Sequence, residues 1–256
     1  HADRVVLYGG SYGTMLYLDF LPRHPAHVET VALQGVAPPG LFVIPLPYAR
    51  AAQRALDRVI ADCAADRSCH TQFPALAAHV VALEHRFDHG PLRIRIQNLA
   101  TKRFETVSLS KEVFADRLRQ TMYNPEGAAL VPLMLERAYH GDAVPLGAMI
   151  QQVTHSVDAV LTTGLNLSVT CAEDVPFITE ADVVRSSART FMGDSRVRAQ
   201  QRACAIWNVH PASRAFVHPV RSTVPILMIS GDDDPASPPA FGRAALRYLP
   251  NARQIV

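Results

Sequence analysis

The segment that most constrains the fold is a short apolar run that leads directly into Gly-Gly-Ser-Tyr-Gly at residues 9–13. The run, Val-Val-Leu-Tyr at residues 5–8, is typical of a buried parallel strand. From Tyr12 to Leu21 the apolar residues follow helical spacing, and residues 28–33 again read as a strand. A strand, a helix and a second strand in so short a stretch predict a parallel α/β sheet.

The turn itself fits the pattern G-x-S-x-G, which is the nucleophile elbow of serine hydrolases. Its sharp strand-to-helix turn lifts the hydroxyl of Ser11 clear of the sheet, and we expect small residues at Gly9 and Gly13 because strand and helix nearly touch there. The backbone N–H of Tyr12, at the start of the helix, can donate to an oxyanion. Two other interpretations are a glycine-rich turn with an incidental serine and a phosphate-binding turn, although the lysine of a P-loop is absent.

A second feature is an acidic turn that directly follows the apolar run at residues 225–230. A catalytic triad needs an acid on a loop beyond the carboxyl end of a strand, where it orients a histidine. Of the three consecutive aspartates we expect Asp234 to be this acid, because Pro235 stiffens its backbone. Asp232 and Asp233 are expected to belong to a solvated turn or a helix cap.

The third triad member should follow the acid in chain order. All eleven histidines precede Asp234, and we expect His210 and His218, the nearest of them, to be surface or cap residues. The histidine is therefore expected after a strand that begins near Gln254, outside this sequence. On this view the chain is a fragment that does not hydrolyse peptides unaided.

The middle of the chain has a different pattern from its two ends. Several Ala- and Arg-rich stretches have helical periodicity, and residues 92–109 alternate as a hairpin would, although an all-helical middle is the safer interpretation. We therefore expect three parts: a hydrolase core with the elbow at residues 1–40, a mainly helical cap at 41–219, and the resumed core with the acid loop at 220–256. The expected fold class is an incomplete α/β-hydrolase fold with a large helical cap inserted between sheet strands.

Composition excludes several classes of function. The net charge of +2 and the absence of a clustered basic face argue against nucleic-acid binding, and no apolar run is long enough for a membrane span. The four cysteines, Cys63, Cys69, Cys171 and Cys204, are compatible with free thiols, zinc ligands or two disulfides. Zinc is disfavoured, because no C-x-x-C pair and no histidine at ligand spacing accompany them. We expect neither a metal nor an organic cofactor.

Several motifs in the same order resemble the secreted bacterial α/β-hydrolases of the tripeptidyl-aminopeptidase and proline-iminopeptidase type. The resemblance covers nearly the whole chain, although Gln34 stands where the family usually has Asp, and the family's strands and second oxyanion loop before the elbow are not present. The segments that carry it are residues 8–14, 33–39, 63–74, 169–174, 204–207 and 225–239.

The resemblance implies Ser11 as nucleophile, Asp234 as triad acid, disulfides Cys63–Cys69 and Cys171–Cys204, and an exported location in the cell envelope or outside it. It also implies a peptide substrate with a free N-terminus. Such an ammonium needs carboxylates in a partly buried pocket, and Glu173 and Asp174, beside Cys171, are the candidates. A helix end decorated with acids is the alternative interpretation of this pair.

Two rival functions remain open at this level. An esterase or lipase would use the same triad, and a non-catalytic binding protein on a degenerate hydrolase scaffold would lack the histidine. The sequence does not give the oligomeric state.

Overall fold

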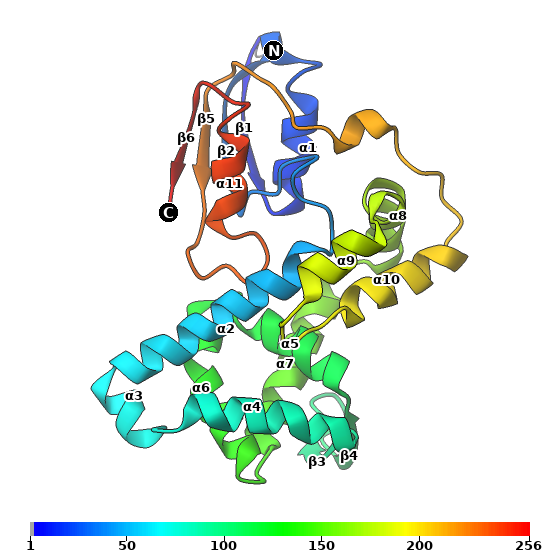
Figure 1. The fold of residues 1–256 in the computed structure, drawn as a ribbon. Helices are drawn as coiled ribbons and strands as arrows, with labels where there is room; N and C mark the ends of the chain where they lie inside the picture. Colours follow the sequence, from blue (N-terminus) through cyan, green and yellow to red (C-terminus); the bar gives the residue numbers. More distant parts are fainter. Residues whose placement is uncertain (1–2) are drawn as a thin grey trace.

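The computed structural model describes residues 3–256 and shows two parts, a parallel sheet with its helices and a larger, mainly helical assembly (Figure 1). The sheet has four parallel strands in the order β1-β2-β5-β6. These strands are β1 (Val5–Gly10), β2 (Val28–Gln34), β5 (Ile226–Ile229) and β6 (Ala252–Ile255). The expected α/β class with a mostly parallel sheet is confirmed.

Side chains on one face of the sheet are buried against helices α1 (Tyr12–Phe20) and α11 (Pro239–Ala245). Burial alternates along β5: Ile226 and Met228 are buried, whereas Leu227 and Ile229 are each 38% exposed. Within residues 3–256 the sheet is therefore covered by helices on one face, although all four residues of β5 are apolar.

Residues 5–8 lie in a parallel strand as expected, but the expectation that this strand is buried is wrong. Val6 and Tyr8 are 64% and 63% exposed. Within residues 3–256, β1 is an edge strand that pairs only with β2, so its apolar character is not matched by burial.

Helices dominate the chain between β2 and β5. They are α2 (Pro47–Ala65), α3 (Arg67–Gln72), α4 (Leu76–Arg86), α5 (Lys111–Thr121), α6 (Pro125–Tyr139), α7 (Val144–Val160), α8 (Thr163–Glu173), α9 (Glu180–Ser187) and α10 (Ser195–Ile206). Short 3₁₀ turns η1 (Pro25–His27), η2 (Phe87–His89), η3 (Val175–Phe177) and η4 (Arg214–Val217) join some of the elements. We call helices α2 to α10, with the segments that join them, the cap; η1 lies before β2 and is not part of it.

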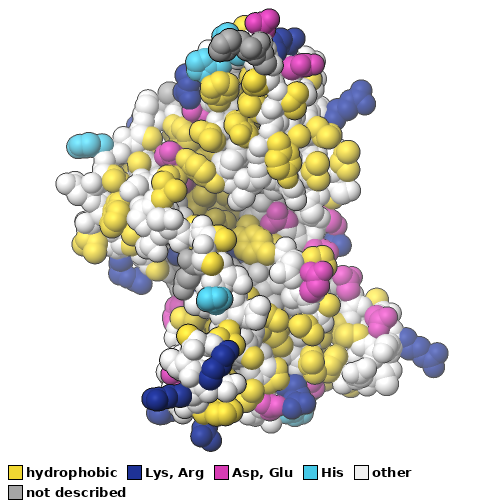
Figure 2. Space-filling model, turned by 180° about the vertical axis from the view of Figure 1, so that it is seen from behind, with side chains coloured by type: hydrophobic (Ala, Val, Ile, Leu, Met, Phe, Trp, Pro, Cys, Tyr) yellow, Lys and Arg dark blue, Asp and Glu magenta, His cyan; other side chains and the backbone are white. Residues whose placement is uncertain are grey.

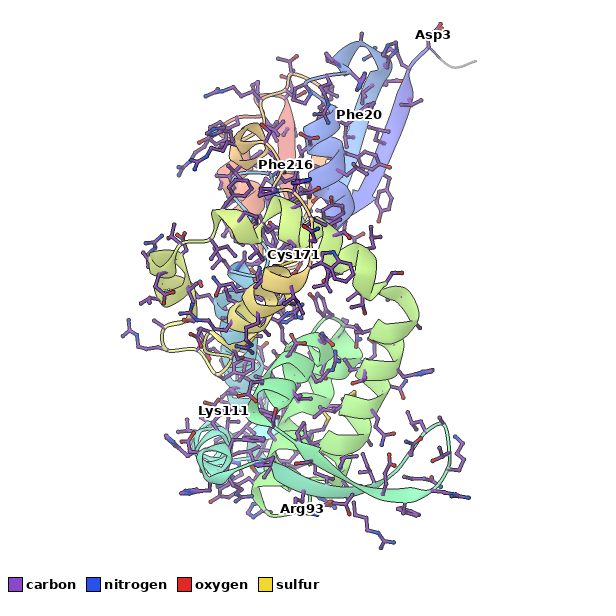
Figure 3. The ribbon with its side chains drawn as sticks, turned by 90° about the vertical axis from the view of Figure 1, so that its right-hand side faces the viewer. Asp3, Phe20, Arg93, Lys111, Cys171 and Phe216 are labelled. Carbon is purple, nitrogen blue, oxygen red and sulfur yellow. A yellow bond between two sulfur atoms is a disulfide. The ribbon has the colours of Figure 1, made fainter. Side chains whose placement is uncertain are left out.

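The all-helical interpretation of the middle is wrong at one place, because β3 (Leu92–Gln97) and β4 (Phe104–Leu109) form an antiparallel hairpin. Ile94 and Ile96 are buried in the cap core, whereas Arg93 and Arg95 are exposed. Figure 3 shows the hairpin, with Arg93 labelled, at the end of the cap farthest from the sheet. The alternation that suggested a hairpin thus outweighs the helical character of its neighbours.

Sheet and cap have separate hydrophobic cores, and a third, smaller cluster joins them. Met15 of α1 packs there with Ala37 and Phe42, next to the ring of Phe241 from α11. Figure 2 shows hydrophobic side chains gathered on the surface between the two parts.

Two disulfides lie within the cap. Cys63 pairs with Cys69 between α2 and α3, and Cys171 pairs with Cys204 between α8 and α10. No helix among residues 3–256 combines the length and apolarity needed to cross a bilayer.

Candidate active site

Ser11 is held at the bend between β1 and α1 in a backbone conformation that non-glycine residues rarely adopt. Its φ is 52° and its ψ is −122°, a strain that costs on the order of 1–3 kcal/mol and persists only where the surroundings impose it. Its N–H donates to the carbonyl of Gln34 at 2.9 Å. The hydroxyl makes no cap hydrogen bond to α1, and the residue is exposed, so its oxygen is accessible for chemistry.

Thr14 fixes the bend from inside the core. Its hydroxyl donates to the carbonyl of Ser11 at 2.7 Å and accepts from the N–H of Ala37 at 2.9 Å. Thr14 is fully buried. A buried threonine therefore ties the elbow to the loop after β2, a role that the sequence pattern alone did not predict.

The expected need for small residues around Ser11 holds on one side only. A Cβ atom added to Gly9 would lie 2.6 Å from the ring of Tyr17 and 2.8 Å from the carbonyl oxygen of Gly13. A Cβ added to Gly13 would meet nothing within 4 Å. The close approach is between the strand residue and the backbone of the helix, so Gly9 rather than Gly13 needs to lack a side chain.

Tyr12 is the first residue of α1, so its N–H has no acceptor in the helix's own i→i−4 pattern. It follows the exposed Ser11 directly, at the positive end of the helix dipole. The structure is therefore compatible with the oxyanion role expected for this N–H.

The acid loop holds the carboxylate of Asp234 by its own backbone. Its Oδ1 accepts from the N–H groups of Ala236 and Ser237, both at 2.8 Å, and its Oδ2 accepts from the hydroxyl of Ser237 at 2.9 Å. An ionised carboxylate accepts about four hydrogen bonds. Oδ2 thus retains the capacity to accept an imidazole N–H.

Gly35 brings the elbow and the acid loop together. Its φ of 62° turns the chain sharply after β2, and its N–H donates to the carbonyl of Ile229 at 2.9 Å. The position that a Cβ would occupy on Gly35 lies 3.6 Å from Asp234 Oδ2 and 4.0 Å from the Ser11 nitrogen. Nucleophile and acid are therefore neighbours across a glycine.

Ser11 and Asp234 line one cleft of about 640 Å³. Its opposite wall comes from the cap, through Met122, Tyr123 and Asn124 between α5 and α6. Among residues 3–256 no histidine lines this cleft, and His210 and His218 lie outside it.

Asp232 and Asp233 also line the cleft, but their carboxylates pair with arginines of the cap. Asp232 Oδ2 lies 2.5 Å from the Arg58 guanidinium and its Oδ1 lies 3.5 Å from that of Arg54, while Asp233 also pairs with Arg58. The expected solvated turn is therefore partly an ion-pair contact between the acid loop and α2.

Glu173 and Asp174 lie at the end of α8, where they contact the core but do not line the Ser11 cleft. Glu173 Oε2 accepts from the phenol of Tyr12 at 2.9 Å, and Asp174 Oδ1 accepts from the N–H of Ile44 at 2.8 Å. Asp174 is 1% exposed, and its Oδ2 has no hydrogen-bond partner among the described residues.

Burial dominates the electrostatics of this acidic pair. It raises the pKa of Asp174 from 3.8 to about 7, with a smaller contribution from the neighbouring Glu173. Burial likewise raises the pKa of Glu173 and that of the Tyr12 phenol. A cation that reached this pair would favour the ionised carboxylates.

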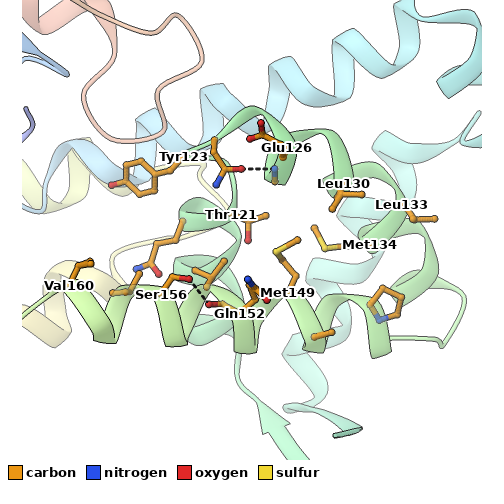
Figure 4. Close-up of a pocket in the computed structure, with 17 residues that line it drawn as sticks. Thr121, Tyr123, Glu126, Leu130, Leu133, Met134, Met149, Gln152, Ser156 and Val160 are labelled. Carbon is orange, nitrogen blue, oxygen red and sulfur yellow. Dashed lines mark hydrogen bonds between the residues drawn. The ribbon is translucent and has the colours of Figure 1, made fainter. Parts of the chain in front are cut away.

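An apolar groove of about 680 Å³ runs between α6 and α7 (Figure 4). Leu130, Leu133, Met134 and Met149 line it, and Tyr123 belongs to both this groove and the Ser11 cleft. The cap therefore offers an apolar surface that adjoins the cleft of the nucleophile.

One family comparison covers the C-terminal quarter of the chain. Residues 189–256 match the model of a family described as TAP-like protein. The match includes α10, the acid loop with Asp234, α11 and β6, but not Ser11. Together with the α/β fold, it supports a hydrolase.

Other comparisons add little detail. The chain is similar to a solved structure described as MGS-M2, an α/β-hydrolase enzyme from a Medee basin deep-sea metagenome library, at 11% identity and a TM-score of 0.33. The alignment covers 99% of this chain and 56% of that one, so the chain spans about half the length of that enzyme. No curated protein compared with the chain gives a significant match.

Proposed function

We propose that the chain supplies the nucleophile and the acid of a serine hydrolase that removes residues or short peptides from the N-termini of peptides. The observation that carries this proposal is the strained, exposed Ser11 in the same cleft as Asp234. A backbone strain of this kind at a strand-to-helix turn is typical of a nucleophile that must project above a sheet.

The reaction proceeds through an acyl-enzyme. A histidine from outside residues 1–256 takes the proton of the Ser11 hydroxyl, and the Oγ–carbonyl carbon bond forms while the N–H of Tyr12 donates to the developing oxyanion. The carbon–nitrogen bond then breaks, and the histidine gives the proton to the leaving amine. Water, deprotonated by the same histidine, then attacks the ester, and the histidine returns this proton to the Ser11 oxygen as the Oγ–carbonyl bond breaks. Asp234 Oδ2 holds the imidazole throughout.

The proposed ammonium site is Glu173 with Asp174. It is supported by the buried carboxylate of Asp174, whose Oδ2 lacks a partner among the described residues. The neighbouring Glu173 connects the pair to the elbow, because it accepts from the Tyr12 phenol. Glu173 is half-buried and Asp174 is buried, so binding of an ammonium requires a movement of the Tyr12 side chain.

The experiment compares arylamide substrates that have a free N-terminus with their N-acetylated forms and with a short p-nitrophenyl ester. The assay uses a form of the protein that contains both residues 1–256 and the segment with the catalytic histidine. The proposal predicts that substrates with a free N-terminus are preferred. Glu173→Gln should raise the KM for these substrates about 10- to 100-fold, as expected for the loss of a hydrogen bond to a charged group. Glu180→Gln is the matched control, since Glu180 is an exposed cap glutamate paired with Arg198.

Equal effects of Glu173→Gln on free and N-blocked substrates would remove the ammonium role. Faster turnover of the ester would instead favour an esterase, the second candidate, which the apolar groove beside Tyr123 supports. If neither the arylamides nor the ester were turned over, the interpretation as a non-catalytic binding protein would be favoured. Residues 1–256 alone are expected to give no product burst.

A further inference from the structure

Two histidines and a glutamate converge on the cap, away from the residues that line the Ser11 cleft. His79 lies on α4, Glu136 lies on α6, and His140 follows the last residue of α6. One ligand atom from each side chain lies within 4.8 Å of the other two. The helices α4 and α6 are side by side in the lower part of Figure 1.

The distances within this cluster are close to those of a metal site. Nδ1 of His79 lies 2.8 Å from Oε2 of Glu136, and Nε2 of His140 lies 3.1 Å from Oε1. A tetrahedral zinc ion with bonds of about 2.0–2.2 Å separates its ligand atoms by roughly 3.4 Å. Side-chain rotations that lengthen these two contacts would therefore make room for an ion between the three groups.

Burial and packing favour an ordered site with one open position. The side chain of Glu136 is 12% exposed and that of His79 is 20% exposed, whereas that of His140 is 62% exposed. The ring of His79 stacks on Tyr139 with centroids 3.9 Å apart, which fixes its plane. A water molecule could complete the coordination on the open side next to His140.

The local charge is also suitable for a cation. As a set of metal ligands, two imidazoles and one carboxylate have a formal charge of −1, and the carbonyl end of α6 adds its partial negative charge. Arg86 donates to the carbonyls of Ala138 and Tyr139 at 3.0 and 2.9 Å and offsets this partial charge, so the attraction for a cation comes mainly from the carboxylate of Glu136. Imidazole and carboxylate together suit zinc and neighbouring divalent transition ions.

We propose that His79, Glu136 and His140 bind one divalent transition-metal ion of the zinc class, which links α4 to the end of α6 and stabilises the cap. The site takes no part in the chemistry at Ser11. All four cysteines are in disulfides, so thiolates do not compete for the ion.

The test is titration of the metal-free protein with Zn²⁺ alone, followed by calorimetry, with Mg²⁺ as the comparison ion. We expect one Zn²⁺ per chain, a rise in melting temperature of roughly 5 °C at saturating Zn²⁺, and no response to Mg²⁺. His140→Ala should weaken Zn²⁺ binding by about 100-fold or more. Loss of a residue that merely hydrogen-bonds to a metal ligand already costs about 10- to 100-fold in metal affinity.

Two further variants keep the result interpretable. Glu136→Gln retains hydrogen-bonding capacity and should also weaken binding at least 10-fold. His85→Ala is the matched control, because His85 is an exposed histidine of α4 that pairs with the single carboxylate of Asp88, and it should bind as the wild type does. Failure of the wild type to bind Zn²⁺ saturably, or equal binding by His140→Ala, would show that the cluster is a hydrogen-bonded network alone.

Discussion

The phenol of Tyr12 donates a hydrogen bond to Oε2 of Glu173 at 2.9 Å, across 161 positions of sequence. Tyr12 directly follows the candidate nucleophile, and Glu173 ends helix α8 of the cap. One hydrogen bond thus connects the elbow to the cap. We expect this contact to help hold the cap against the elbow.

Removal of the Tyr12 hydroxyl should therefore destabilise the protein. Tyr12→Phe leaves the half-buried Glu173 without its donor, and we expect a loss of about 1–3 kcal/mol in the free energy of unfolding, measured in urea. Tyr17→Phe is the control on the same helix, because the Tyr17 hydroxyl makes none of the hydrogen bonds found among residues 3–256. Equal losses of stability in the two variants would show that the hydrogen bond between Tyr12 and Glu173 does not stabilise the protein.

The contribution of Asp174 to the stability of the protein should fall as pH rises from about 4 to about 7. Burial raises the pKa of Asp174 to about 7 in the folded state, so the folded protein holds a proton that the unfolded chain releases near pH 4. Each pH unit by which the folded-state pKa exceeds the unfolded-state pKa corresponds to a loss of about 1.4 kcal/mol in the free energy of unfolding across this pH range. The raised pKa of Glu173 acts in the same direction.

Asp174→Asn should flatten this pH dependence, since an amide does not titrate and still offers an oxygen to the N–H of Ile44. Urea midpoints at pH 5 and pH 8 for both proteins measure the effect. The variant should lose less stability than the wild type between the two values. Parallel losses would mean that Asp174 is ionised throughout.

Alanine at the two glycines that flank the elbow should have opposite effects. Gly9→Ala places a methyl group against Tyr17 and the carbonyl of Gly13, and we expect a cost of about 1–3 kcal/mol or more. Gly13→Ala enters open space in a helix and should stabilise the protein by roughly 0.5–1 kcal/mol. Thermal unfolding of both variants gives the comparison, and a larger loss for Gly13→Ala would contradict this packing of strand against helix.

Neighbouring aspartates of the acid loop should differ sharply in their effect on activity. In the active protein, Asp234→Asn should lower kcat about 10⁴-fold, because the amide no longer orients the imidazole correctly. Asp233→Asn removes only an exposed ion pair with Arg58 and should lower kcat less than tenfold. Comparable losses in both variants would remove Asp234 from the role of triad acid.

Features set by adjacent residues could be predicted from the sequence. The bend at Ser11 and the turn at Asp234 depend on local glycine, proline and strand signals, and both lie where those signals place them. The mainly helical character of the cap also follows from periodicity, although not every one of its helices was predicted.

Features set by distant residues could not be predicted. No local pattern shows that Thr14 hydrogen-bonds to Ala37, or that Asp232 contacts Arg54 and Arg58 at sequence separations of 178 and 174. The exposure of Val6 and Tyr8 was missed because an apolar strand has the same pattern at the edge of a sheet as at its centre. The His79 cluster combines two helices and has no continuous motif.

Covalent labelling of the active protein with a fluorophosphonate, read out by intact and peptide mass, tests the central claim most directly. The account predicts one adduct per chain on Ser11, complete loss of the adduct in Ser11→Ala, and retention in Ser237→Ala, the other serine of the cleft. An adduct that persists in Ser11→Ala, or that lies on Ser237, would contradict the assignment of Ser11 as nucleophile.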